Sequence, residues 1–310
     1  MFPMTLNTII SIILIILLGY VLRKFKLFGR NFIDTFSSSL YKFLIPFFFF
    51  WIITNESGTG TFGWKVSLTV VFLILFAYQI GYLFTHIFKM SEESAFSLIA
   101  GCYRFDLGLG LALIYFVFDR SIVKDFCLIL IFLLPILDVL SSFSIKGMLK
   151  EKKKSINGLT SIKCIIFNPI IVGGVLGWVS SEAGFMFPVF INKAAEMIIS
   201  IIFPLVLIIA GGSINTGRTS PIEKAFVIGA ASKIIILPIL AYLCLTAIGV
   251  GPNPLSVVII FFTVPSLLES KIVANLYDLQ KCNSFVFFTT PIIVFFLSIS
   301  FWIYILGQNV

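Results

Sequence analysis

Six ionisable side chains fall near the middle of long apolar stretches, where a lipid bilayer tolerates charge poorly. They are Arg104, Asp106, Asp138, Lys233, Glu269 and Lys271. A charge at the bilayer centre costs about 2.5 kcal/mol or more, so such residues usually face protein or a cavity, pair with one another and mark substrate or ion pathways. Three are positive and three are negative. Ion pairs that only fix helix packing are therefore the alternative for any one of them.

The stretch around Pro265 combines a helix breaker with polar side chains. Proline removes a backbone donor and clashes with the preceding turn, and inside a membrane the freed backbone groups must be satisfied by protein, water or ligand. Ser266 and Glu269 follow on the same side of the helix, with Lys271 just beyond. We predict that Pro265, Ser266 and Lys271 line a binding site. Glu269 is a candidate to carry a coupling charge.

The stretch 102–110 carries the complementary groups. Arg104 can bind a carboxylate through a forked pair of hydrogen bonds, and Asp106 can take a proton or a monovalent cation. Gly108 can let the chain unwind or let another backbone approach closely. We predict that Arg104, Asp106 and Gly108 belong to the same site. Asp106 and Asp138 are further candidates for the coupling charge, and both a proton and sodium fit them.

Two more polar residues are secondary candidates. Asn168 precedes a proline at the start of a span, so its amide can cap the freed backbone or point into a cavity. Lys233 lies near the middle of its span. The glycines that follow Asn168, at 173, 174 and 177, favour tight helix packing.

Composition places these residues in a polytopic membrane protein. The chain has 310 residues, 59% of them hydrophobic, and a mean hydropathy of +1.10. Several runs reach the ~20 apolar residues that a helix needs to cross a bilayer, and they lack the ten-residue alternation of a barrel. We predict an all-α fold with ten spans, at about 5–23, 32–53, 64–88, 94–118, 122–148, 161–180, 191–214, 222–249, 254–279 and 284–306.

The positive charges indicate topology. The net charge is +8, but the basic residues lie mostly in short loops between spans, so they do not indicate a nucleic-acid surface. They gather after the odd-numbered spans, which predicts that these loops are cytoplasmic and that both termini lie outside. The longest such loop, 150–160, fits a linker that anchors orientation, or a contact for anionic lipid headgroups.

An internal repeat is indicated by spacing rather than by identity. Gly19 lies 27 residues before Pro46, and Gly177 lies 27 residues before Pro204, so both pairs share an offset of 158 (177 − 19 and 204 − 46). The same offset places the middle of span 4 opposite the middle of span 9.

The two halves, 1–149 and 161–310, hold five spans each. Because five is odd, the second half must enter the membrane from the opposite face. This arrangement is an inverted repeat, in which many secondary transporters place their substrate site where discontinuous helices meet.

Metal chemistry and catalysis find little support. His86 is the single histidine, and the five cysteines lack metal or disulfide spacing. The chain has no metalloprotease, nucleophile-elbow or phosphate-loop motif. We expect no metal site, no cofactor and no enzymatic activity.

Several of these residues stand in motifs that resemble the auxin efflux carrier family, which includes plant auxin carriers and prokaryotic transporters of malonate, malate and related carboxylates. The motifs are Gly19-Tyr20, Leu44-Ile45-Pro46, Arg104-Phe105-Asp106-Leu107-Gly108, Asn168-Pro169, Phe203-Pro204 and Val264-Pro265-Ser266. The resemblance implies the transporter fold shared with bile-acid and arsenite carriers, with helices 4 and 9 broken and crossing at the substrate site. It also implies an elevator exchange of helices 3–5 and 8–10 against a scaffold of helices 1, 2, 6 and 7.

The chain departs from the family pattern in span 4. Asp106 stands where the family normally has asparagine, and Leu111 stands where it has proline. Without that proline, two alternatives remain for span 4, a broken helix and a helix that is only softened. The extra carboxylate suggests coupling to a cation or a different substrate.

These features together predict a secondary transporter of a small organic anion, a carboxylate above all, in a bacterial inner membrane. One alternative is a sodium-coupled symporter of the related bile-acid type. The other is a membrane receptor or channel in which the charges are structural pairs. The Phe-rich stretch Phe47–Trp51 fits either a homodimer seam or contact with lipid.

Overall fold

A computed structural model describes residues 2–58, 62–90, 92–148, 167–214, 224–264, 298 and 301–302. Every regular element in these ranges is a helix. Seven helical stretches among them are long and apolar enough to cross a membrane. The predictions of an all-α fold and of an integral membrane protein are therefore confirmed at this level.

The helix boundaries follow the predicted spans closely. The elements are α1 (Phe2–Lys24), α2 (Arg30–Ser39), η1 (Leu40–Leu44), α3 (Ile45–Asn55), α4 (Trp64–Ile87), α5 (Glu92–Tyr103), α6 (Leu107–Val117), α7 (Arg120–Met148), α9 (Pro169–Glu182), α10 (Val189–Ser213), α11 (Lys224–Ala231), η2 (Ser232–Ile236), α12 (Leu237–Ala247) and α13 (Pro252–Thr263). Span 2 consists of α2, η1 and α3, and span 8 of α11, η2 and α12. The linker 150–160, the second half of span 9 and most of span 10 lie outside the described residues.

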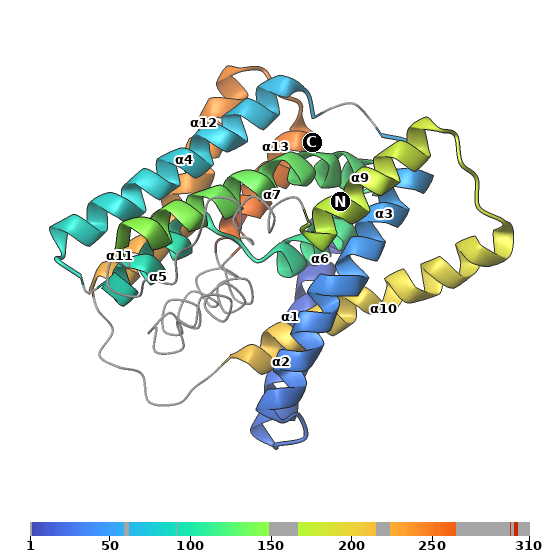
Figure 1. Cartoon of the computed structure of the whole chain (residues 1–310), viewed down its shortest axis with the longest axis horizontal. Coiled ribbons are helices and arrows are strands. Elements are labelled where there is room, and N and C mark those ends of the chain that lie inside the picture. Colours follow the sequence, from blue (N-terminus) through green and yellow to red (C-terminus); the bar gives the residue numbers. More distant parts are fainter. Residues whose placement is uncertain are drawn as a thin grey trace.

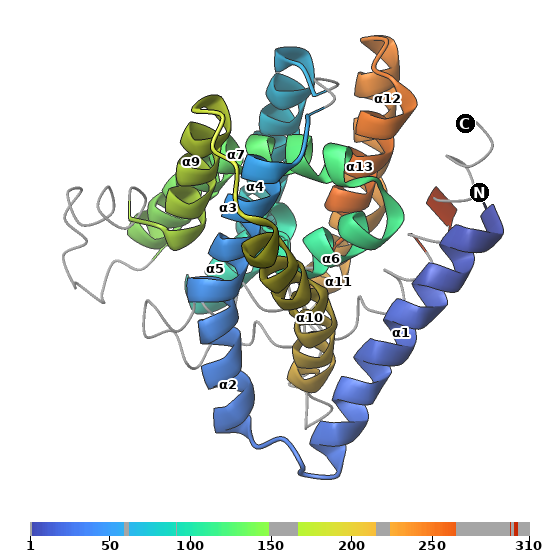
Figure 2. The ribbon, with the colours of Figure 1, turned by 90° about the vertical axis from the view of Figure 1, so that its right-hand side faces the viewer.

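The helices form two groups (Figure 1). The first helix group consists of α1, α2, η1, α3, α9 and α10. The second consists of α4, α5, α11, η2, α12 and α13, and α6 and α7 lie between the groups. Figure 2 shows α10 between α1 and the span formed by α2 and α3, in agreement with the contacts of α10 to all three.

Glycines bring the helices of the first group into backbone contact. A methyl group at Gly19 of α1 would overlap the carbonyl oxygen of Ile208 in α10. At Gly177 of α9, an added Cβ would lie 2.7 Å from the carbonyl oxygen of Phe50 in α3. Small residues allow such close approach in a membrane, where helices gain stability from van der Waals packing. The packing role predicted for the glycines of α9 is therefore confirmed.

The two close contacts are equivalent under the predicted offset. Gly177 follows Gly19 by 158 positions, and Ile208 follows Phe50 by the same 158 (177 − 19 and 208 − 50). The pair α1 and α10 is thus joined through the same positions as the pair α3 and α9.

Two wide helical turns precede prolines inside spans 2 and 8. The π-helical turn η1 ends two residues before Pro46, and η2 ends two residues before Pro238. A proline ring clashes with the carbonyl four residues earlier, and a wider turn relieves that clash. Both spans consequently continue through their prolines.

Span 4 is interrupted, as the family resemblance implies, although it lacks the family's proline. The helix α5 ends at Tyr103, residues 104–106 are not helical, and α6 begins at Leu107. Asp106 has an extended backbone (φ −81°, ψ 106°), and its side chain accepts a hydrogen bond from the backbone N–H of Leu109 at 3.0 Å. An aspartate cap can start a new helix, which explains a break without a proline.

The glycines of span 4 do not form the break. Of the two roles predicted for Gly108, the structure shows close packing rather than unwinding. Gly108 and Gly110 lie inside the first turn of α6. A Cβ on Gly108 would lie 2.9 Å from Cγ1 of Val206 in α10. Gly108 therefore allows α6 to pack closely against the first helix group.

Candidate functional site

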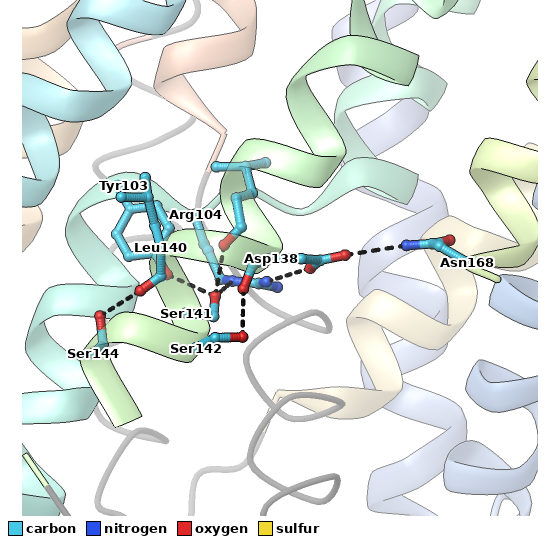
Figure 3. A network of polar contacts seen from close by, with 9 residues as sticks. Tyr103, Arg104, Asp138, Leu140, Ser141, Ser142, Ser144 and Asn168 are labelled. Carbon is cyan, nitrogen blue, oxygen red and sulfur yellow. Dashed lines mark hydrogen bonds and ion pairs between the residues drawn. The ribbon is translucent and has the colours of Figure 1, made fainter. Parts of the chain in front are cut away.

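Arg104 lies at the break of span 4 and is held by two residues of α7 (Figure 3). Its Nη2 lies 2.9 Å from Oδ1 of Asp138, and its Nε donates to Oγ of Ser141 at 2.9 Å. The side chain is 5% exposed. A buried guanidinium requires both a counter-charge and satisfied hydrogen bonds, and α7 supplies both.

Tyr103 and Ser141 fix the orientation of this guanidinium. The Tyr103 hydroxyl lies 2.7 Å from Oγ of Ser141, which itself donates to the carbonyl of Leu137 at 2.8 Å. The hydroxyl of Ser141 therefore has a defined direction when it accepts from Arg104. Ser141 follows Asp138 by three residues, so both side chains lie on one face of α7.

Asp138 connects the two helix groups. Its Oδ1 binds Arg104, and its Oδ2 accepts from Nδ2 of Asn168 at 3.3 Å. The other end of the Asn168 amide caps α9, because Oδ1 accepts from the backbone N–H of Ile170 at 3.1 Å. The side chain of Asp138 is 31% exposed, so it is far more accessible than its partner Arg104.

Two residues reach the break from the wide turns of spans 2 and 8. Lys233 of η2 is buried and donates through Nζ to the carbonyl oxygen of Arg104. Tyr41 of η1 donates through its hydroxyl to Oδ1 of Asp106 at 3.1 Å, and the same hydroxyl accepts from the backbone N–H of Gly108 at 3.4 Å. Both ends of the break are thus bonded to other helices.

The end of α13 packs against the break from the other side. The rings of Phe105 and Phe261 have centroids 3.6 Å apart, and the backbone of Val264 is extended where α13 ends. Under the offset of 158, Val264 corresponds to Asp106 (264 − 106). The described end of span 9 therefore lies beside span 4.

The structure brings five predicted site residues into one region. These are Arg104, Asp106, Asp138, Asn168 and Lys233. Gly108 is also there, in a packing role. Pro265, Ser266, Glu269 and Lys271 lie outside the described residues, so their place in the site stays a prediction. Arg104 is paired with Asp138 in this structure, and its predicted role in binding an anion stays a prediction.

Sequence reasoning did not identify Tyr41, Tyr103 or Ser141. A signal exists for Tyr41, because it stands five residues before Pro46, as Lys233 stands five residues before Pro238 (46 − 41 and 238 − 233). The spacing from Asp138 could have pointed to Ser141. Tyr103 carries no such signal, since its role depends on how α5 meets α7.

The positive and negative groups of the site balance, and the carboxylate bound to Arg104 can be replaced by another carboxylate. Among its four charged groups within the described ranges, Arg104 and Lys233 are positive and Asp106 and Asp138 are negative. A guanidinium that is paired with a partly accessible carboxylate can bind a second carboxylate instead, since each carboxylate offers two acceptor oxygens. In the part of the chain that the structure describes, no three His, Cys, Asp or Glu side chains gather to hold a metal ion.

One comparison with known proteins gives a match. The model of a family described as "Membrane transport protein" matches residues 138–303, more than half of the chain. The match includes Asp138, Asn168 and Lys233 as well as the predicted site around Pro265. No curated protein matches the chain.

Proposed function

The chain belongs to the membrane transport protein family, and from that premise we propose that it is a secondary transporter of a small organic anion, a carboxylate above all. The observation that carries this proposal is the buried Arg104 at the break of span 4, paired with the accessible carboxylate of Asp138. A fixed guanidinium is suited to bind a carboxylate through two parallel hydrogen bonds. The resemblance to auxin efflux carriers supports the same substrate class.

Binding proceeds by exchange of carboxylates at Arg104. The substrate carboxylate takes the place of Asp138, which keeps its contact with Asn168 and is neutralised by a proton or sodium. Without such neutralisation, two carboxylates would share one guanidinium, and like charges at that distance disfavour each other. Binding of the anion and of the cation are therefore coupled. Asp106, Glu269 and Lys271 are further candidates for ligands or coupling charges.

The two helix groups provide the means for alternating access. The first helix group serves as the scaffold, and the second moves against it with α6 and α7. The equivalent contacts of Gly19 and Gly177 support an inverted repeat of ten helices, the usual architecture for such movement. We place the protein in a bacterial inner membrane with both termini outside and leave a monomer and a homodimer as the alternatives for its assembly.

A binding screen followed by an uptake measurement tests the substrate class. We expect mono- or dicarboxylates to raise the thermal midpoint of the purified protein, because a ligand that binds only the folded state adds ~2.7 kcal/mol at a concentration of 100 Kd. The same compounds should enter proteoliposomes in a saturable manner. The amides of these acids are the matched controls, since they keep the shape and lose the charge. Equal stabilisation by acids and amides, or no uptake of any stabilising acid, contradicts the proposal.

Asp106→Asn tests whether the charge of Asp106 couples transport to a cation, because it removes the charge and keeps the helix cap. Asparagine caps a helix about as well as aspartate, and its carbonyl can still accept from Tyr41, so we expect the protein to fold. If Asp106 carries the coupling charge, uptake by the variant loses its dependence on pH or on sodium. The measurement is uptake into proteoliposomes at two pH values, with and without a sodium gradient.

Asp138→Asn is the companion variant in that measurement. If uptake loses its dependence on pH or on sodium in Asp138→Asn alone, the coupling charge is assigned to Asp138. Unaltered coupling in both variants excludes both carboxylates.

A further inference from the structure

Tyr41 and Lys233 occupy corresponding places in two π-helical turns. Each is the second residue of its turn and stands five residues before the proline that follows. Turns of this kind are rare and occur often at functional sites. Here both direct a long polar side chain at the break of span 4.

The two side chains satisfy opposite ends of the break. Lys233 donates to the carbonyl of Arg104, directly after α5, where the helix dipole favours a cation. Tyr41 bonds to the start of α6, through Oδ1 of Asp106 and the backbone N–H of Gly108. Backbone groups at depth in a membrane need such partners, so both residues help to keep the break intact.

The two residues differ in the helix group that carries them. Lys233 belongs to the second helix group, as does α5, so its bond to Arg104 lies within one group. Tyr41 belongs to the first, so its bonds to Asp106 and Gly108 cross the boundary between groups. Val206 of α10 contacts Gly108 from the same side. Tyr41 and Val206 therefore both hold the start of α6 against the first group.

We propose that Tyr41 is a positioning residue that ties the break of span 4 to the scaffold in the observed arrangement and releases it when the transport helices move. This inference rests on the proposed function, because it requires that the two helix groups move relative to each other. A hydroxyl suits this role, since its bond to a carboxylate is charge-assisted yet involves one rotatable O–H. The bond favours the observed arrangement without locking it.

A cross-link between the groups reports the observed arrangement. Arg120 at the start of α7 lies 3.4 Å from Glu196 of α10, and both side chains are about half exposed. In a background with Arg120→Cys and Glu196→Cys, a membrane-impermeant bis-maleimide links the two positions only while the two helix groups are in the observed arrangement. The same chain without the two substitutions gives the background reaction of the native cysteines, of which Cys102 and Cys127 are buried.

In that background we expect Tyr41→Phe to lower the ratio of cross-linkable to non-cross-linkable protein, obtained from the rate of cross-linking, about tenfold, a fold-change that corresponds to ~1.4 kcal/mol. Tyr103→Phe is the matched control, because it removes a hydroxyl hydrogen bond of 2.7 Å to Ser141 that does not involve the first group. It should lower the thermal midpoint and leave the rate of cross-linking unchanged. A merely structural role for Tyr41 would make the two variants behave alike.

A second variant keeps the test decisive if Tyr41→Phe does not fold. Asp106→Asn turns the charge-assisted bond into a neutral one of about half the strength, so the rate of cross-linking should fall by about threefold. Unchanged cross-linking in Tyr41→Phe, an equal fall in Tyr103→Phe, or unchanged cross-linking in Asp106→Asn overturns the inference. Cross-linking needs no substrate, so a protein that transports no organic anion still gives a result, and failure of the proposed function is seen separately.

Discussion

Arg104→Gln is expected to lower carboxylate uptake at least a hundredfold and to reduce the free energy of unfolding by about 2 kcal/mol. Removing one partner of a buried, hydrogen-bonded charge pair costs 2–5 kcal/mol or more in binding, which corresponds to about thirtyfold to several thousandfold. The stability loss is smaller than the roughly 3–5 kcal/mol of a fully buried broken pair, because Asp138 is 31% exposed and water can partly solvate it. Uptake into proteoliposomes and thermal denaturation in detergent measure the two effects.

The double variant Arg104→Gln with Asp138→Asn separates the two roles of Arg104. It removes both charges, so no carboxylate is left without a partner, and the free energy of unfolding should return to within about 1 kcal/mol of the parent chain. Uptake should stay lost, because the guanidinium that we propose as the carboxylate ligand is absent. If the double variant transports as well as the parent chain, the pair is structural and Arg104 does not bind the substrate.

Arg104→Lys refines the result. Lysine keeps the charge near Asp138 but presents a point charge instead of a planar fork. We expect it to preserve most of the stability and to raise KM for a carboxylate by about tenfold, the loss of one charge-assisted hydrogen bond. An unchanged KM would mean that the substrate does not use the fork.

The sequence predicts most of the fold because lipid imposes strong rules on it. The length of each apolar run predicts a span. The helices of the structure begin and end within a few residues of the predicted positions, as at Trp64–Ile87 and Val189–Ser213. The family resemblance implied the break in span 4, but the absence of the family's proline left open whether this chain keeps it. Asp106 supplies a different signal, since its side chain caps the following helix.

The sequence identifies several of the polar residues that the structure brings together, but not which of them pair. Charges in apolar spans identify Arg104 and Asp138, but they are 34 positions apart, and periodicity within one helix does not say which faces of two helices meet. Tyr41 was missed for a related reason. An aromatic residue in an apolar span is usually packing, and only the wide turn η1 and the close approach of α6 bring its hydroxyl to Asp106.

The equivalent glycine contacts lead to the second large effect. Gly19→Ala and Gly177→Ala each place a methyl group against a backbone carbonyl of the partner helix. Neither carbonyl can rotate away, so the helices must separate and lose contacts along their length. We expect each variant to lower the free energy of unfolding by about 3 kcal/mol, the upper part of the range for overpacked sites. The yield of monodisperse protein and its thermal midpoint give the measurement.

Gly110→Ala is the matched control, because it is also a glycine inside a buried helix. Its added methyl would lie 3.8 Å from Cγ2 of Val264, an ordinary contact, and alanine is the better helix former by about 1 kcal/mol. This variant should be as stable as the parent chain or more stable. If Gly19→Ala and Gly177→Ala differ widely from each other, the two helix pairs are not equivalent in energy, and the inverted repeat loses its main structural support. If both match Gly110→Ala, close backbone packing does not hold the scaffold together.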